Sequence, residues 1–207
     1  MPRRMADSKF CDEQYQHRYD EHIARINRFV DELRRNGKEV PYVASMHGGV
    51  NARLLSVLSD PGRMTRENGG SGFLCMENDD PTAEKISKLF AEAGIYACDV
   101  LPWNAYPWYI NRTPKPVELQ IGIEPLKHII DLLPALRVVM LHGVSAHKGW
   151  KKLTRQYPDL VAVRGLHVIE TYHPSPQAFR HPDPGVRASR HEDLHEAFYE
   201  ASRYLRL

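Results

Sequence analysis

The chain has 207 residues, a formal net charge of +2 at pH 7 and three cysteines. This length suits one domain, so we expect a single domain over residues 1–207, with residues 1–40 as a helical extension packed on it. Cys11, Cys75 and Cys98 are odd in number and far apart, which argues against a disulfide framework and against a zinc or iron–sulfur site. No apolar run is long enough to span a membrane, and the N-terminus lacks the apolar core of a signal peptide. We therefore expect a cytoplasmic protein that has no membrane partner.

In the first half of the chain, helical and strand patterns alternate. Apolar residues recur at helical spacing between about residues 12 and 36, which predicts an amphipathic helix. Asp80 is a suitable N-cap for a second helix, because Pro81 fits its first turn and Gly94 its end. The strands expected here cover about residues 53–58 and 95–101.

The second half begins with an aromatic and proline-rich segment, residues 102–114, which is more typical of a wall or lid than of a linker. A capping box at residues 189–192 predicts the start of the last helix. The other helices expected are at about residues 116–133 and from about residue 144, and the strands are at residues 137–141 and 166–173. This alternation favours an α/β fold: one three-layer α/β/α domain with a central, mainly parallel four-stranded sheet.

Polar side chains follow the expected strands. Because parallel strands end at one edge of a sheet, Asp60, Asn104, His142 and His173 should meet there. These groups suit cleavage of an N-glycosidic bond to a pyrimidine. An amide pairs with N3–H and O4 of uracil, a neutral imidazole hydrogen-bonds O2 as the base leaves, and a carboxylate positions water. An aromatic ring would stack on the flipped base.

Several segments resemble motifs of the uracil-DNA glycosylase superfamily. Residues 59–62 (SDPG) are similar to its first motif, and residues 173–176 (HPSP) match its second motif closely. Phe73 in residues 72–74 matches its stacking phenylalanine in type and approximate spacing. Residues 139–143 resemble its third strand, and residues 111–118 are similar to a stretch of its iron–sulfur branch. The resemblance covers roughly residues 53–205.

The resemblance implies a monofunctional DNA glycosylase of base excision repair that uses no metal or cofactor and acts as a monomer. It would flip uracil or a related damaged base out of single- or double-stranded DNA and hydrolyse its glycosidic bond. Asp60 and His173 would be catalytic, whereas Gly62, Phe73 and Asn104 would bind the base. Asn78 is the alternative to Asn104. The residues expected to contact DNA are Ser59, Ser175, Gln177 and Arg180.

The chain departs from the superfamily at three points. Gly62 stands where the main uracil-specific enzymes carry a tyrosine that excludes the thymine methyl group. Gln177 stands where a leucine wedges into the base stack, and Phe179 or Arg180 is close enough to serve instead. The three cysteines do not supply the four ligands of the iron–sulfur branch.

Two other functions stay open. A member of the same superfamily with altered substrates, or one that binds nucleic acid without turnover, would keep the same pocket. A metal-dependent hydrolase would use some of the eleven histidines, among which His191 and His195 lie four residues apart in the expected last helix.

Overall fold

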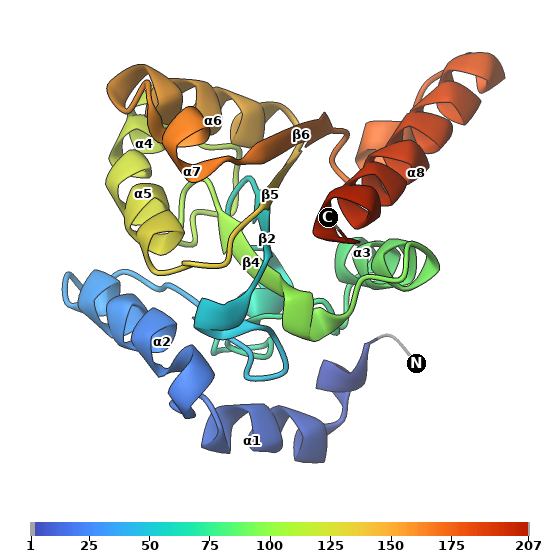
Figure 1. Ribbon diagram of the computed structural model, residues 1–207. Coiled ribbons are helices and arrows are strands. Elements are labelled where there is room, and N and C mark those ends of the chain that lie inside the picture. Colours follow the sequence, from blue (N-terminus) through green and yellow to red (C-terminus); the bar gives the residue numbers. More distant parts are fainter. Residues whose placement is uncertain (1–2, 207) are drawn as a thin grey trace.

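The computed structural model describes residues 3–206 and has a parallel four-stranded sheet at its centre (Figure 1). The strands lie in the order β4-β2-β5-β6. They are β2 (Leu54–Leu58), β4 (Val100–Asn104), β5 (Val138–His142) and β6 (His167–Thr171). Because β5 is buried along its whole length, its continuous apolar sequence is that of a strand covered on both faces. The predicted α/β/α fold with a parallel sheet is confirmed.

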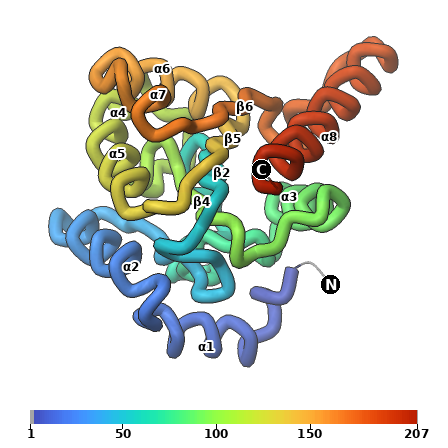
Figure 2. The backbone as a smooth tube through the Cα atoms, viewed as in Figure 1, coloured from blue at the N-terminus to red at the C-terminus, as the bar shows by residue number. Residues whose placement is uncertain are grey.

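Helices cover both faces of this sheet (Figures 1 and 2). Leu55, Val57 and Leu141 belong to the core on one face, whereas Leu54 and Met140 belong to the core on the other, as the alternation of strand side chains requires. The first face packs against α2 (Glu21–Arg34), α4 (Pro116–Ile121), α5 (Ile123–Asp131), α6 (Val144–Gln156) and α7 (Leu160–Arg164). The second packs against α3 (Pro81–Glu92) and α8 (Pro184–Arg206).

A small second sheet was not expected from the sequence. Its parallel strands, β1 (Tyr42–Val43) and β3 (Phe73–Leu74), have only two residues each, which is too short for a visible alternation. The N-terminal helix α1 (Ser8–Gln16) lies beside this region, and Met5, Phe10 and Cys11 pack with Phe73. The first residues of the N-terminal region are thus joined to the domain through this small core, whereas α2 packs in the main core.

Two predicted helices are each divided in two. The predicted helix over residues 12–36 is interrupted at residues 17–20, between α1 and α2. The predicted helix over residues 116–133 is divided at Gly122, where a Cβ atom would lie 1.9 Å from the carbonyl oxygen of Ala105. Glycine therefore lets the chain approach the loop that follows β4.

Two boundaries differ from the sequence prediction. The strand expected at residues 95–101 begins only at Val100, because a 3-10 turn, η4 (Ala97–Asp99), precedes it. The capping box at residues 189–192 is wrong as a helix start, because α8 begins at Pro184 and continues through it. Asp183 instead accepts a hydrogen bond from the Gly185 N–H at 2.7 Å.

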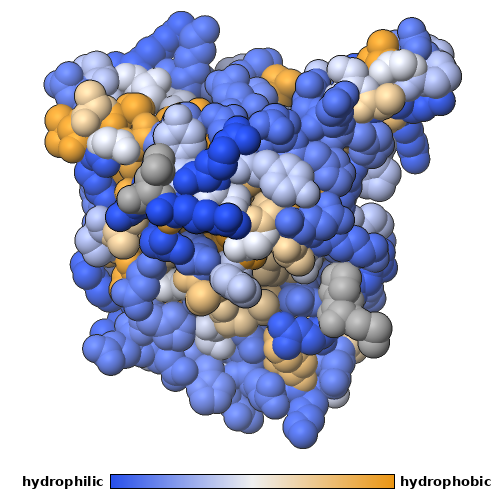
Figure 3. Space-filling view, turned by 45° about the vertical axis from the view of Figure 1, so that its right-hand side comes forward, coloured by the Kyte–Doolittle hydropathy of each residue, from blue (hydrophilic) through white to orange (hydrophobic). Residues whose placement is uncertain are grey.

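The helices within residues 3–206 include none that is both long and apolar enough to cross a membrane. Figure 3 shows that hydrophilic side chains cover most of the face that it displays, with hydrophobic side chains in smaller groups.

Candidate active site

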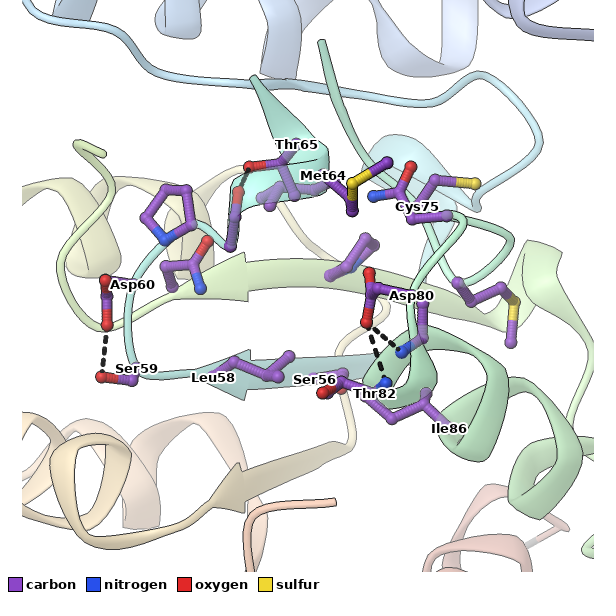
Figure 4. A pocket seen from close by; sticks show the side chains of 18 of the residues that line it. Ser56, Leu58, Ser59, Asp60, Met64, Thr65, Cys75, Asp80, Thr82 and Ile86 are labelled. Atoms are coloured by element: carbon purple, nitrogen blue, oxygen red, sulfur yellow. Dashed lines mark hydrogen bonds between the residues drawn. The ribbon is translucent and has the colours of Figure 1, made fainter. Parts of the chain in front are cut away.

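A cavity of about 470 Å³ lies at the carboxyl ends of β2, β4 and β6. Figure 4 shows part of its lining, with Ser59 and Asp60 at one end. Most of the predicted site residues line it: Ser59, Asp60, Gly62, Asn104, His173 and Gln177. The structure therefore brings together the carboxylate, the amide and one of the two imidazoles predicted at the edge of the sheet.

Asp60 follows β2 and is held by its neighbour. The Ser59 hydroxyl donates a hydrogen bond of 2.7 Å to Oδ1 of Asp60. Burial raises the pKa of the Asp60 carboxyl above its usual value, although the Ser59 bond and the charge of Arg112 act in the opposite direction. Arg112 itself is bound to Glu118, with an Nη1–Oε2 distance of 2.7 Å. The sequence pattern around Arg112 did not predict a role for it at this site.

His173 has a defined neutral tautomer. The backbone N–H of Ser175 donates to its Nδ1 at 3.1 Å, so the proton of the neutral ring resides on Nε2. Burial lowers the pKa of His173, which favours this neutral form. Gly143 has φ +84° and lies against His173, because a Cβ atom built at Gly143 would be only 2.9 Å from the Cβ of His173. The turn after β5 thus needs glycine for His173 to occupy its place.

Of the two candidate asparagines, Asn104 is the one whose carboxamide oxygen is unused. Asn104 is the last residue of β4 and is only 3% exposed, and its Oδ1 has no hydrogen-bond partner within the described residues. Asn78 also lines the cavity, but its Nδ2 donates to the Phe73 carbonyl at 2.8 Å and its Oδ1 accepts from the Ser71 hydroxyl at 2.7 Å. Asn78 therefore stabilises its own loop, whereas the carboxamide oxygen of Asn104 stays unpaired among residues 3–206.

Phe73 is not among the residues that line the cavity. Its ring is buried against the N-terminal region, with ring centroids 6.5 Å from Tyr15 and 6.1 Å from Tyr42. The next residue of β3, Leu74, lines the cavity instead, because successive strand residues point to opposite sides. The position of Phe73 thus does not fit the stacking role expected for it.

His142 is also absent from the cavity lining, contrary to the expected cluster. It lies fully buried in the sheet, and its Nε2 is 2.9 Å from the Ser56 hydroxyl oxygen. Burial, with smaller contributions from His173 and His147, lowers the pKa of His142 to about 3. His142 is therefore a neutral part of the core, and its hydrogen-bond partner Ser56 lines the cavity.

The loop after β6 carries three of the four residues expected to contact DNA, and the fourth, Ser59, follows β2. Gln177 and Arg180 are exposed on and beside the short turn η5 (Pro176–Phe179), and Ser175 is half-buried. Phe179 is buried and stacks on His191 with ring centroids 4.2 Å apart. Its burial argues against the wedge role considered for it and leaves Gln177 and Arg180 on the surface.

The two histidines of α8, His191 and His195, each contact a side chain of another element. His191 stacks on Phe179, and its Nδ1 lies 3.1 Å from the Lys85 amine, whereas His195 lies 3.4 Å from Glu92. Within residues 3–206, no group of three or more histidine, cysteine or acidic side chains is placed to hold a metal ion.

A carboxylate, a neutral imidazole and a free amide at the edge of a parallel sheet suit a base-excising hydrolase. The family model described as the Uracil DNA glycosylase superfamily matches residues 46–199, which is most of the chain. The chain therefore belongs to this superfamily, a DNA glycosylase-type family whose members act on DNA. A search of curated proteins found no match.

Proposed function

We propose that the protein is a monofunctional DNA glycosylase that hydrolyses the N-glycosidic bond of uracil, or of a related damaged base, in DNA. The proposal rests on the observation that Asp60, His173 and Asn104 all line the same cavity. The superfamily membership supports the reaction type, and the free atoms of these side chains support the choice of base. The reaction would leave an abasic site for base excision repair in the cytoplasm.

Asn104 reads the Watson–Crick edge of the flipped base. Its Oδ1 accepts from N3–H of uracil, and its NH₂ group donates to O4. Cytosine presents a lone pair at N3 and an amino group at C4, so both contacts would be repulsive. A buried amide without protein partners discriminates strongly, because the wrong base leaves its polar atoms unpaired.

His173 stabilises the leaving base. As the bond between C1′ and N1 breaks, the electron pair stays on the base and negative charge develops on O2. The Nε2–H of the neutral ring donates to O2, while the Ser175 N–H holds the ring through Nδ1. A donor fixed before the reaction begins is most effective at this point, because it needs no reorganisation.

Asp60 acts on the sugar side. Its carboxylate, oriented by Ser59, positions a water molecule against C1′ and stabilises the positive charge on the sugar. When the water oxygen bonds to C1′, Asp60 accepts the water proton. The base leaves as an anion that takes a proton from solvent, and Asp60 returns its proton to solvent. The products are the free base and an abasic sugar, and the strand stays intact.

The DNA strand would lie across the mouth of the cavity. Ser59 and Ser175, with nearby backbone amides, would bind the phosphates that flank the flipped nucleotide. Gln177 and Arg180, both exposed beside the mouth, would contact the neighbouring bases and backbone. We propose that one molecule acts alone on the strand.

The proposal is tested by cleavage of single-stranded and duplex oligonucleotides that contain uracil, in the presence of chelator, with alkali to reveal abasic sites. His173→Ala and Asp60→Asn should each lower the single-turnover rate about 10²–10⁴-fold. The exposed His17→Ala is the matched control and should cleave like the wild type. Tight binding of uracil-containing DNA without base release would instead identify a non-catalytic member, and activity lost in chelator would point to a metal-dependent hydrolase.

A further inference from the structure

The backbone ladder of the central sheet ends two residues before His173. The last register pairs between β5 and β6 are Leu141 with Glu170 and His142 with Thr171, and both strands end there. β5 and β6 lie side by side in the sheet, and α6 follows β5 (Figure 1). The direction in which His173 leaves the sheet must therefore be fixed by contacts beyond the ladder.

His147, in the first turn of α6, makes such a contact. Its Nε2 lies 3.0 Å from the carbonyl oxygen of Leu141 and 3.1 Å from the carbonyl oxygen of Thr171. Because a carbonyl oxygen only accepts hydrogen bonds, Nε2 of His147 carries a proton and donates it to both oxygens. One side chain thus joins the ends of two neighbouring strands.

This contact does not depend on the charge of the His147 ring. Nδ1 of His147 lies 3.7 Å from Oε2 of Glu170, and the Glu170 side chain is 60% exposed. An ion pair with so exposed a carboxylate is weak. Nε2 keeps its proton whether or not Nδ1 gains one, so the bonds to the two carbonyl groups hold the ring in both states.

The two carbonyl groups belong to the segments that meet at His173. Thr171 precedes His173 by two residues, and its carbonyl oxygen also accepts from the Gly143 N–H at 2.8 Å. Leu141 precedes Gly143 by two residues, and a Cβ atom built at Gly143 would lie 3.4 Å from the backbone nitrogen of His173. A change in the spacing of the two strand ends would therefore move His173.

We propose that His147 is a positioning residue for His173. By joining the ends of β5 and β6, it fixes the place from which Nε2–H of His173 donates to O2 of the leaving base. This inference rests on the proposed function and deepens it, because a displacement of about 1 Å at a reacting group can cost on the order of 10²-fold in rate.

The test compares two amide substitutions, His147→Gln and His147→Asn. Glutamine can place its amide NH₂ near the position of Nε2 and donate to both carbonyl groups, whereas the shorter asparagine ends near the position of Nδ1. The single-turnover rate of uracil release from a single-stranded oligonucleotide is measured for each variant, with and without His173→Ala. His128→Asn, at an exposed position of α5, is the matched control.

Binding is measured separately from the reaction. The probe is the same oligonucleotide with 2′-fluoro-2′-deoxyuridine, whose fluorine slows base loss by destabilising positive charge on the sugar. A residue that only positions His173 should change the rate of release and leave the affinity for this probe nearly unchanged.

His147→Asn should lower the rate about tenfold to a hundredfold and change the probe affinity less than about threefold. His147→Gln should stay within about threefold of the wild-type rate, because it keeps the donor. Combined with His173→Ala, His147→Asn should lower the rate less than about threefold further, because the two substitutions act through one group. His128→Asn should change neither quantity, and His147→Leu provides the same test if His147→Asn does not fold.

The inference is overturned if a folded His147→Asn variant releases uracil at the wild-type rate, or if it slows release equally with and without His173→Ala. It is also overturned if His147→Gln is as slow as His147→Asn, because the donor to the carbonyl groups would then have no part in the effect. A wild type that releases no uracil, or a His173→Ala variant as fast as the wild type, would contradict the proposed function itself, so the two failures are distinguishable.

Discussion

Two buried asparagines line the cavity, and they should respond to substitution in opposite ways. Asn104→Ala should abolish most uracil release but leave the melting temperature nearly unchanged, because Oδ1 of Asn104 has no protein partner among residues 3–206. Asn78→Ala should lower the free energy of unfolding by about 1–3 kcal/mol, because it removes the two buried hydrogen bonds that Asn78 makes with the Phe73 carbonyl and the Ser71 hydroxyl. Thermal melting and single-turnover excision on both variants check this. Equal loss of stability in the two would contradict it.

Residue positions were predictable where a side chain lies at the end of a strand or within two residues after it. Asp60, Asn104 and His173 do so, and a parallel sheet brings such residues to one edge whatever the loops do. The directions of the Phe73 and His142 side chains were not predictable, because each depends on the face of its strand. The two-residue strand β3 shows no alternation, and β5 is buried along its whole length, so its sequence has no polar face.

At the scale of elements, the turn between β5 and α6 controls the position of His173. Gly143 has φ +84° and ψ 173°, a conformation essentially restricted to glycine. Gly143→Ala should cost about 1–3 kcal/mol of stability and, by displacing His173, lower excision about tenfold to a hundredfold. The measurement is the excision rate alongside chemical denaturation.

Gly165→Ala is the matched control for this prediction. Gly165 is left-handed, with φ +58°, and no heavy atom lies within 4 Å of a Cβ built there. Alanine should cost about 1–2 kcal/mol at this position and leave excision unchanged. Equal activity in the two variants would show that the turn at Gly143 does not position His173.

Helices and strands were predictable from apolar runs and helix caps, but the points at which two of the predicted helices are divided were not. Asp80 caps α3 as expected, because the cap depends only on residues next to it. The division between α4 and α5 depends on the carbonyl of Ala105, a contact between segments separated in sequence. Local patterns do not contain such contacts, so the sequence predicted one continuous helix.

At the scale of the whole molecule, two buried histidines should make the fold sensitive to acid. Burial lowers the pKa of His47 to about 4 and that of His142 to about 3, from an ordinary value of 6.5. Below pH 6.5 the unfolded chain binds protons that the folded one excludes, so stability is complete above that pH and falls as the pH drops toward 4. Between pH 7 and pH 5 the two groups together should remove on the order of 3 kcal/mol.

Chemical denaturation at the two pH values measures this loss. His47→Gln should reduce the pH dependence by about half, if the two histidines contribute equally. His17→Gln, at an exposed position, should not change it. A wild-type stability that is the same at pH 7 and pH 5 would contradict the assignment of both rings as neutral core groups.

The central claim is that this cavity releases a base from DNA by water attack at C1′. The most direct measurement is chromatographic detection of free uracil after stoichiometric protein is mixed with a single-stranded uracil oligonucleotide, with borohydride added to a parallel sample to trap any covalent protein–DNA intermediate. We predict one free uracil per strand, no trapped adduct, and a strand that is intact before alkali. Strand cleavage without free uracil, or a folded protein that releases no base, would contradict it.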